Sequence, residues 1–174
     1  MQITLVRHTS LCVPSGICYG ISDLDVSSTF TQEASIIKRN LIDKSFNKVY
    51  SSPLQRCTKL ASFCGYIAPE IDNRLLELNF GNWEMKAWEE ISDPQLEKWY
   101  ANWIDESPTN GESFRSMINR VDEFLKELKS KNENCLIFTH AGVIRVFFIL
   151  LNYLPANRIF ELEVEYGEIF ELNI

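Results

Sequence analysis

The chain has only two histidines, and each directly follows a short apolar segment with the pattern of a buried β-strand. His8 follows ITLVR (residues 3–7), and His140 follows CLIFT (residues 135–139). Open α/β sheets bind ligands at the carboxyl ends of their strands, so we expect both imidazoles to reach one pocket. Arg7 directly precedes His8, and guanidinium groups recognise phosphate oxygens through paired hydrogen bonds. The segment therefore predicts an anionic ligand.

A second candidate phosphate contact is Arg56, in the segment SSPLQR (residues 51–56). Its expected place is the first turn of a helix, where the helix macrodipole disfavours a positive charge. A bound phosphate would remove that conflict. A solvated surface arginine is the other interpretation that this segment allows.

The segment THAG (residues 139–142) supplies a third candidate contact. The small residues Ala141 and Gly142 let backbone N–H groups at a helix start approach an oxyanion closely. A plain strand-to-helix turn would have the same sequence, so the segment alone leaves both interpretations open.

Glu77 lies between two leucines, Leu76 and Leu78. A carboxylate in such a setting is either the salt-bridge partner of an arginine or an acid kept protonated for proton transfer. From this segment alone we favour the salt bridge.

Alternating strands and helices are expected to position these groups. The longest helix signal begins at Ser113, and its apolar residues recur at helical spacing as far as Leu128. The tail has the pattern of a hairpin or of two edge strands, at residues 162–164 and 169–172. Three further strands are expected at residues 2–7, 48–51 and 135–138. Four further helices are also expected. The first is capped by Thr31, the second begins at Pro53 after a Ser52 cap, the third runs from Asp93-Pro94 to Trp103, and the fourth runs from Val143 to Leu151.

This order of elements predicts an α/β fold. We expect a three-layer α/β/α sandwich with a mostly parallel central sheet and helices on both faces. The length of 174 residues is typical of one domain with a substantial core, so we expect a single domain over residues 1–174.

Composition limits the partners that the protein can have. The chain has a net charge of −7 and therefore lacks the excess of basic residues that is typical of nucleic-acid-binding proteins. A few arginines can still form a local positive pocket. The five cysteines include no CxxC pair and indicate reduced thiols. There is no signal-peptide pattern, and the most apolar stretch, Val143 to Leu151, is too short to span a membrane. We expect a cytoplasmic protein with no nucleic-acid or membrane partner; a homodimer stays open.

Five segments together resemble the histidine phosphatase superfamily, which has the phosphoglycerate mutase-like fold. The resemblance implies that His8 is a nucleophile that forms a phosphohistidine, and that Glu77 donates a proton to the leaving group. It also implies that Arg7, Arg56 and His140 hold the phosphoryl oxygens, with no metal or other cofactor. The segments are RH (7–8), SSPLQR (51–56), LELNFGNWE (76–84), NGES (110–113) and THAG (139–142).

Four positions depart from the commonest pattern of that family. Thr9 stands where glycine is usual, and Pro14 stands where an asparagine often contacts phosphate. Ala141 stands where glycine is frequent, and Met85 stands where glycine usually follows Trp-Glu. RHT (7–9) and GICYGISD (16–23) instead resemble one branch, the α-ribazole phosphatases of cobalamin nucleotide-loop assembly. This resemblance implies α-ribazole 5′-phosphate as the substrate. The substrate-binding candidates that it adds are Thr9, Tyr19, Gly20 and Ala141, of which Tyr19 could face a base or sugar or could only pack the loop.

Other functions remain open at this level. A phosphoglycerate mutase would need extra covering segments that a chain of this length lacks, whereas a broad sugar-phosphate phosphatase could use the same groups. A binding module without catalysis conflicts with the presence of every proposed catalytic group. A metal site made of His8, His140 and Glu77 conflicts with the neighbouring arginines, which would repel a cation. The sequence leaves open whether Trp88, Trp99 and Trp103 line the pocket or the core.

Overall fold

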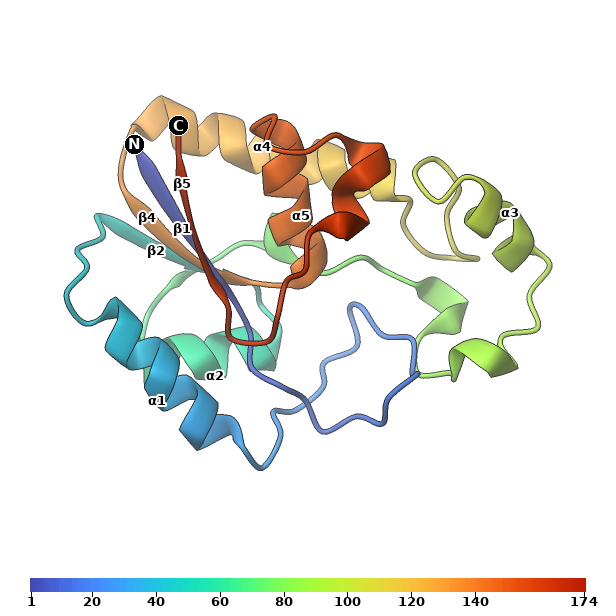
Figure 1. Ribbon diagram of the computed structural model, residues 1–174, viewed down its shortest axis with the longest axis horizontal. Coiled ribbons are helices and arrows are strands. Elements are labelled where there is room, and N and C mark those ends of the chain that lie inside the picture. The colour runs from blue at the N-terminus through green and yellow to red at the C-terminus, as the bar shows by residue number, and fades with distance from the viewer.

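The computed structural model describes residues 1–174 and contains one five-stranded sheet with the order β3-β2-β4-β1-β5 (Figure 1). The first four strands in this order are parallel, and β5 pairs antiparallel with β1 at one edge. Arg7 pairs with Thr139 and Ser51 pairs with Phe138, so β1, β2 and β4 end at the same edge. The strands are β1 (Gln2–Arg7), β2 (Lys48–Ser51), β3 (Glu70–Ile71), β4 (Cys135–Thr139) and β5 (Ile169–Asn173).

Helices cover both faces of this sheet, which confirms the predicted three-layer α/β/α fold. Helices α1 (Phe30–Leu41) and α2 (Gln55–Phe63) pack on one face, and α4 (Phe114–Lys131) and α5 (Ala141–Leu150) pack on the other. Helix α3 (Gln95–Ala101) lies away from the sheet (Figure 1). The short 3-10 helices are η1 (Asn73–Leu75), η2 (Gly81–Trp83), η3 (Trp88–Glu90) and η4 (Ala156–Glu161). No helix combines the length and the apolar character that a membrane crossing requires.

Helix α4 supplies much of the larger core. It begins at Phe114, one residue after the predicted start at Ser113, and Ser113 caps it, because its side chain accepts a hydrogen bond from the backbone N–H of Ser116. Seven apolar residues recur at helical spacing from Phe114 to Leu128, and of these only Ile118 is not buried. The buried residues of this stripe are Phe114, Met117, Val121, Phe124, Leu125 and Leu128.

Several predicted helix boundaries were wrong by a few residues, among them the start of α5, which is Ala141 and not Val143. Helix α1 begins at Phe30, before the expected Thr31 cap, and α3 ends at Ala101, before Trp103. Helix α2 begins at Gln55 and not at Pro53, because the Asp23 carboxylate accepts a hydrogen bond from the Gln55 backbone N–H at 2.7 Å. A residue 32 positions away therefore caps this helix, and no local pattern could reveal that contact.

The tail also differs from the prediction. It contains one strand, β5, and residues 162–164 are not in a strand. Between them Gly167 has a φ of +73°, a conformation that favours glycine. Its backbone N–H donates to the carbonyl of His8, so the turn before β5 lies beside the end of β1 (Figure 1). The hydrogen bonds that a hairpin would have made within the tail are thus made to β1.

Candidate active site

The two histidines meet at the carboxyl edge of the sheet, as predicted. His8 follows β1 and His140 follows the neighbouring strand β4, and their ring centroids are 5.2 Å apart. Both side chains are buried, with exposed fractions of 2% and 0%. Two parallel strands that pair directly therefore bring together residues 132 positions apart.

The hydrogen bonding of His8 leaves one ring nitrogen free. Its Nδ1 lies 2.8 Å from the carbonyl oxygen of Thr9. Because a carbonyl only accepts, Nδ1 carries the proton and Nε2 has an unprotonated lone pair. Burial, followed by the positive charge of Arg56, lowers the pKa of His8 well below its usual value. His8 is therefore a neutral imidazole near pH 7, with its reactive nitrogen unprotonated.

Both ring nitrogens of His140 have partners. Nδ1 accepts from Nε of Arg56 at 3.3 Å, and Nε2 lies 2.8 Å from Oγ of Ser52. Since Arg56 only donates, Nε2 carries the proton and donates it to Ser52. Burial and the charge of Arg56 lower the pKa of His140 well below its usual value. Ser52, expected as a helix cap, instead orients this histidine.

Arg56 is fully buried, so its interpretation as a solvated surface residue was wrong. Its guanidinium donates to the carbonyl oxygens of Ser22 (2.7 Å) and Gly20 (2.6 Å), which belong to the loop before α1. No carboxylate forms an ion pair with Arg56 or with Arg7. A buried positive charge without a counterion is costly, and a bound anion would offset that cost.

Arg7 also has an N–H group for which the protein supplies no acceptor. Its Nη1 donates to the carbonyl of Val164, whereas its Nε is buried and has no partner. A buried N–H group without a partner costs free energy that a ligand oxygen at this position would recover. Arg7 and Arg56 together make this edge of the sheet an electropositive cradle next to His8.

Glu77 faces the beginning of α5 and forms no salt bridge, so the favoured interpretation of its segment was wrong. Its carboxylate oxygens accept from the backbone N–H groups of Leu78 (3.0 Å) and Gly142 (3.1 Å). A Cβ at Gly142 would lie 2.2 Å from Oε1 of Glu77. Glycine at this position is therefore required for the carboxylate to reach the helix start.

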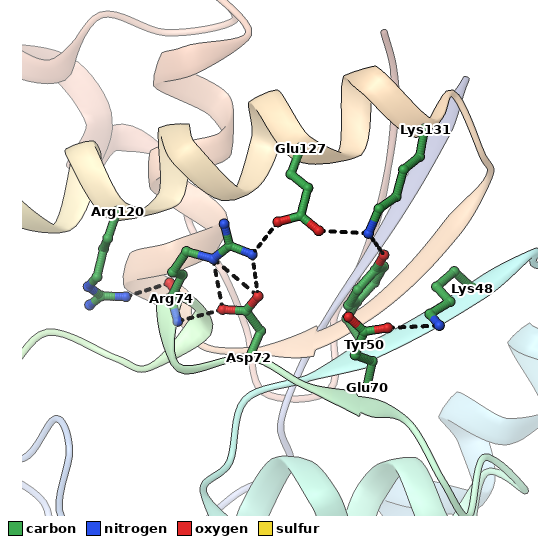
Figure 2. Close-up of polar contacts among 8 residues, drawn as sticks. All are labelled: Lys48, Tyr50, Glu70, Asp72, Arg74, Arg120, Glu127 and Lys131. Carbon is green, nitrogen blue, oxygen red and sulfur yellow. Dashed lines mark hydrogen bonds and ion pairs between the residues drawn. The ribbon is translucent and has the colours of Figure 1, made fainter.

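Arg120 on α4 holds the backbone that carries Glu77. Its guanidinium donates to the carbonyl of Arg74 at 2.6 Å, drawn in Figure 2, and to that of Glu77 at 3.2 Å. Both carboxylate oxygens of Glu112 accept from Arg120, at 2.7 and 2.9 Å. This paired arrangement fixes the plane of the guanidinium.

A network beside it ties the edge of the sheet to α4 (Figure 2). Arg74 binds Asp72 in its own segment and Glu127 on α4, with nitrogen–oxygen distances of 2.5 and 2.7 Å. Glu127 also pairs with Lys131, which donates to the hydroxyl of Tyr50. Helix α4 therefore holds η1, and with it the chain that leads to Glu77, on the sheet.

A pocket of about 320 Å³ opens beside these groups. Arg7, His8 and Glu77 supply polar groups to it, whereas His140 and Arg56, which were also expected to reach it, are fully buried and do not line it. Ten of its fifteen lining residues are hydrophobic. The indoles of Trp88 and Trp99 stack in its wall, with centroids 5.9 Å apart and planes at 23°. All three tryptophans that the sequence left open line this pocket; they are Trp88, Trp99 and Trp103.

Residues 3–174 match the histidine phosphatase superfamily (branch 1). The chain belongs to this superfamily. Because this match covers nearly the whole chain, the resemblance inferred from five short segments is confirmed, and the protein is a phosphatase.

Named relatives and solved structures agree with this assignment. The adenosylcobalamin/alpha-ribazole phosphatase of Salmonella typhimurium is 29% identical over 96% of this chain and 87% of its own. Phosphoserine phosphatase 1 of Hydrogenobacter thermophilus is 28% identical over 87% of this chain and 76% of its own. The crystal structure of the alpha-ribazole phosphatase from Shigella flexneri superposes with a TM-score of 0.91 at 26% identity, covering 100% and 91% of the two chains.

The four substrate-binding candidates of this histidine phosphatase fall into two groups. Tyr19 and Ala141 line the pocket, whereas Thr9 and Gly20 do not. Thr9 is fully buried and acts through its carbonyl, which accepts from His8. The carbonyl of Gly20 accepts from Arg56, and a Cβ there would lie 1.7 Å from the carbonyl oxygen of Leu78. These two residues position the groups around the pocket and do not face it.

Glu84 organises the loop that contains Gly20. Its carboxylate accepts from the backbone N–H groups of Gly20, Ile21 and Ser22 at 3.0 to 3.1 Å. Hydrogen bonds from these groups and from the Ser22 hydroxyl lower the pKa of Glu84 although burial opposes them. The motif that matched the family thus includes a carboxylate that shapes the loop over Arg56.

Sequence reasoning missed two residues of the site, Arg145, which lines the pocket, and Tyr166, which does not. The available signal for Arg145 was its charge, which interrupts the apolar stretch from Val143 to Leu151. Tyr166 lies against Arg7, with the guanidinium carbon 3.9 Å from its ring centroid. Nothing in the local pattern of the tail distinguishes Tyr166 from a surface tyrosine. The metal site considered from His8, His140 and Glu77 is not formed, since no three His, Cys, Asp or Glu side chains are placed to share a cation.

Proposed function

We propose that the protein hydrolyses phosphomonoesters through a phosphohistidine on His8. The observation that carries this proposal is the neutral imidazole of His8, with a free Nε2, beside two arginines that have no carboxylate partner. A dianionic phosphoryl group would satisfy both guanidinium groups and meet the nucleophile at once.

The reaction follows from these positions. Nε2 of His8 attacks phosphorus as the bond to the leaving oxygen breaks, and protonated Glu77 delivers a proton to that oxygen. Water then attacks the phosphohistidine, loses a proton to Glu77 and releases inorganic phosphate, which leaves His8 neutral again. Arg7 and Arg56 hold the phosphoryl oxygens during both steps, and His140 joins them by giving the phosphoryl group the Nε2–H that it otherwise donates to Ser52.

We propose α-ribazole 5′-phosphate as the substrate. Its flat aromatic base matches a pocket whose wall contains the stacked indoles of Trp88 and Trp99. Relatives named for this substrate align over 96% of the chain. A phosphorylated amino acid or glycerate would find Arg145 as a partner for its carboxylate but would leave the rest of a mostly apolar wall without a matching group.

The test compares initial rates of phosphate release from α-ribazole 5′-phosphate, phosphoserine, 3-phosphoglycerate and fructose 1,6-bisphosphate. We expect kcat/KM to be highest for α-ribazole 5′-phosphate by at least about tenfold, a difference of about 1.4 kcal/mol in transition-state binding. Equal rates on all four esters would favour a broad sugar-phosphate phosphatase, and interconversion of 3- and 2-phosphoglycerate would favour a mutase.

His8→Ala is the control variant in this comparison. It removes the nucleophile, so turnover of every ester should fall to background while circular dichroism shows a folded protein. Full hydrolysis by this variant would exclude the phosphohistidine route. Phosphate binding without any turnover by the unaltered protein would instead favour the binding-module alternative.

We further propose that residues 1–174 act as one domain in the cytoplasm. All five cysteines are free in the structure, which supports a reducing compartment. A homodimer stays open, and light scattering at several protein concentrations would decide whether two copies pair.

A further inference from the structure

Tyr166 lies against both groups that the end of β1 supplies to the site. The guanidinium carbon of Arg7 is 3.9 Å from the centroid of its ring, and the ring of His8 is 5.6 Å away. The residue is 39% exposed. The hydrolysis itself requires no tyrosine, and the position of Tyr166 therefore needs another explanation.

The turn that carries Tyr166 is joined to β1 on both sides. The Gly167 N–H donates to the carbonyl of His8 at 3.1 Å, and the Arg7 N–H donates to the carbonyl of Glu168 at 3.0 Å. The Arg7 side chain itself donates to the carbonyl of Val164. The turn and the end of β1 therefore form one hydrogen-bonded unit, which places the ring of Tyr166 next to Arg7.

A stacked ring fixes a guanidinium without using its hydrogen bonds. The aromatic face attracts the cation through its quadrupole, while the N–H groups lie in the plane of the guanidinium and stay available. In Arg7 one donor is used and another is not: Nη1 donates to the carbonyl of Val164, whereas the buried Nε has no partner. The ring and the carbonyl together leave Nε as a donor for a ligand.

A second tyrosine holds this ring from the opposite side of the site. The hydroxyl groups of Tyr19 and Tyr166 are 2.7 Å apart, and they join the loop before α1 to the turn before β5. The ring of Tyr19 lies 5.9 Å from the guanidinium carbon of Arg56. Burial and the Tyr166 hydroxyl raise the pKa of Tyr19, so it keeps its proton near pH 7. Each tyrosine thus faces one of the two arginines, and the hydroxyl pair links them.

We propose that Tyr166 is a positioning residue that orients Arg7 for phosphate binding by stacking on its guanidinium, and that Tyr19 holds Tyr166 through the hydroxyl pair. This inference rests on the part of the proposed function in which Arg7 binds the phosphoryl group. It does not depend on which ester is the substrate.

The test measures phosphate binding in three variants. Tyr166→Leu removes the ring, Tyr166→Phe keeps the ring and removes the hydroxyl, and Tyr153→Leu removes a tyrosine of similar exposure (50%) that contacts Phe148, away from the pocket. Calorimetry gives the dissociation constant of orthovanadate, and assays with p-nitrophenyl phosphate give KM, kcat and the inhibition constant of inorganic phosphate. Thermal unfolding of each variant controls for stability.

We expect Tyr166→Leu to weaken vanadate and phosphate binding by about tenfold, within the range reported for desolvated cation–π contacts. Tyr166→Phe should weaken binding by about two- to threefold, because its ring still faces Arg7. Tyr153→Leu should bind as the unaltered protein does. A merely structural role would lower thermal stability in Tyr166→Leu without this ordering of phosphate affinities.

Equal phosphate affinity in Tyr166→Leu and the unaltered protein would overturn the inference and leave the proposed hydrolysis intact. Failure of the unaltered protein to bind vanadate would overturn both. If Tyr166→Leu does not fold, Tyr166→Phe and Tyr19→Phe remain decisive, because both remove the same hydrogen bond. Their losses should be equal and should not add in the double variant, whereas additive losses would exclude the hydroxyl link.

Discussion

At the scale of single residues, burial assigns different chemistry to side chains of the same type. His8 and His140 are both buried, but Thr9 leaves the Nε2 of His8 free, whereas Ser52 and Arg56 occupy both nitrogens of His140. Only His8 therefore has a lone pair for attack on phosphorus. No strand pattern encodes whether a protein group contacts the second ring nitrogen of a histidine. The absence of such a contact makes His8 a nucleophile, and its presence leaves His140 able only to form hydrogen bonds.

Glu77 gives a residue-scale prediction. Glu77→Gln cannot supply a proton, so hydrolysis of α-ribazole 5′-phosphate should slow by at least about 100-fold, the lower range for general acid catalysis. Hydrolysis of p-nitrophenyl phosphate should slow far less, because p-nitrophenolate leaves without protonation. Steady-state kinetics on both esters checks this, with Glu97→Gln, an exposed carboxylate on α3, as the control. Equal losses on the two esters would contradict the role of Glu77 as the acid.

At the scale of elements, the site is assembled by helices and loops that hold one another through backbone groups. Asp23 caps α2 from the loop before α1, and Arg56 in the first turn of α2 binds the carbonyls of the same loop. Arg120 on α4 fixes the segment that ends at Glu77. These contacts connect elements far apart in the chain, so each element depends on the others for its final position.

Arg120 gives an element-scale prediction. Arg120→Lys keeps the charge but cannot bind Glu112 in pairs and two carbonyls at once, so the segment carrying Glu77 should lose its fixed position. We expect kcat for α-ribazole 5′-phosphate to fall at least about tenfold, KM to change little, and the free energy of unfolding to fall by about 1–3 kcal/mol.

The matched control for this variant is Arg115→Lys on the same helix. Arg115 pairs with Asp105 at the surface, where side chains are about half exposed and an ion pair contributes at most about 1 kcal/mol. Activity should therefore be retained. A similar loss in both variants would show that any change from arginine to lysine on α4 is enough, and that the contact with the Glu77 segment is not responsible.

At the scale of the whole molecule, a parallel sheet covered by helices creates a buried site whose groups resist protonation. The pKa of His8 and of His140 is lowered by burial and by nearby arginines, whereas both histidines titrate near pH 6.5 in the unfolded chain. Between these values the unfolded state binds more protons than the folded state. The protein should therefore lose stability as the pH falls below about 6.5.

This pH dependence is the prediction for the whole molecule. Each histidine should reduce the free energy of unfolding by up to about 1.4 kcal/mol per pH unit below pH 6.5, before carboxylates with lowered pKa begin to contribute. Urea unfolding at several pH values between 7.5 and 5 measures the slope. His8→Ala should show about half of it, and a slope of zero would mean that the histidines are not buried as neutral groups.

Much of the fold and site could be predicted from the sequence because those features are local. Alternating apolar segments predicted β1, β2, β4 and the apolar stripe of α4, and short motifs located His8, Arg56, Glu77 and His140. The helix starts at Gln55 and Phe30 were missed because distant residues and loop geometry determine them. The salt bridge expected for Glu77 failed for a related reason, since its partners are backbone N–H groups at the start of α5.

The sequence by itself determined which residue types reach the carboxyl edge of the sheet, because strand ends and the residues after them can be read from a period of two. Only the tertiary structure decided their states: the free Nε2 of His8, the Ser52 partner of His140, the carbonyls around Arg56, and the ring of Tyr166 on Arg7. The physical reason is that burial and hydrogen-bond partners set protonation and orientation, and these partners come from segments that are distant in the chain.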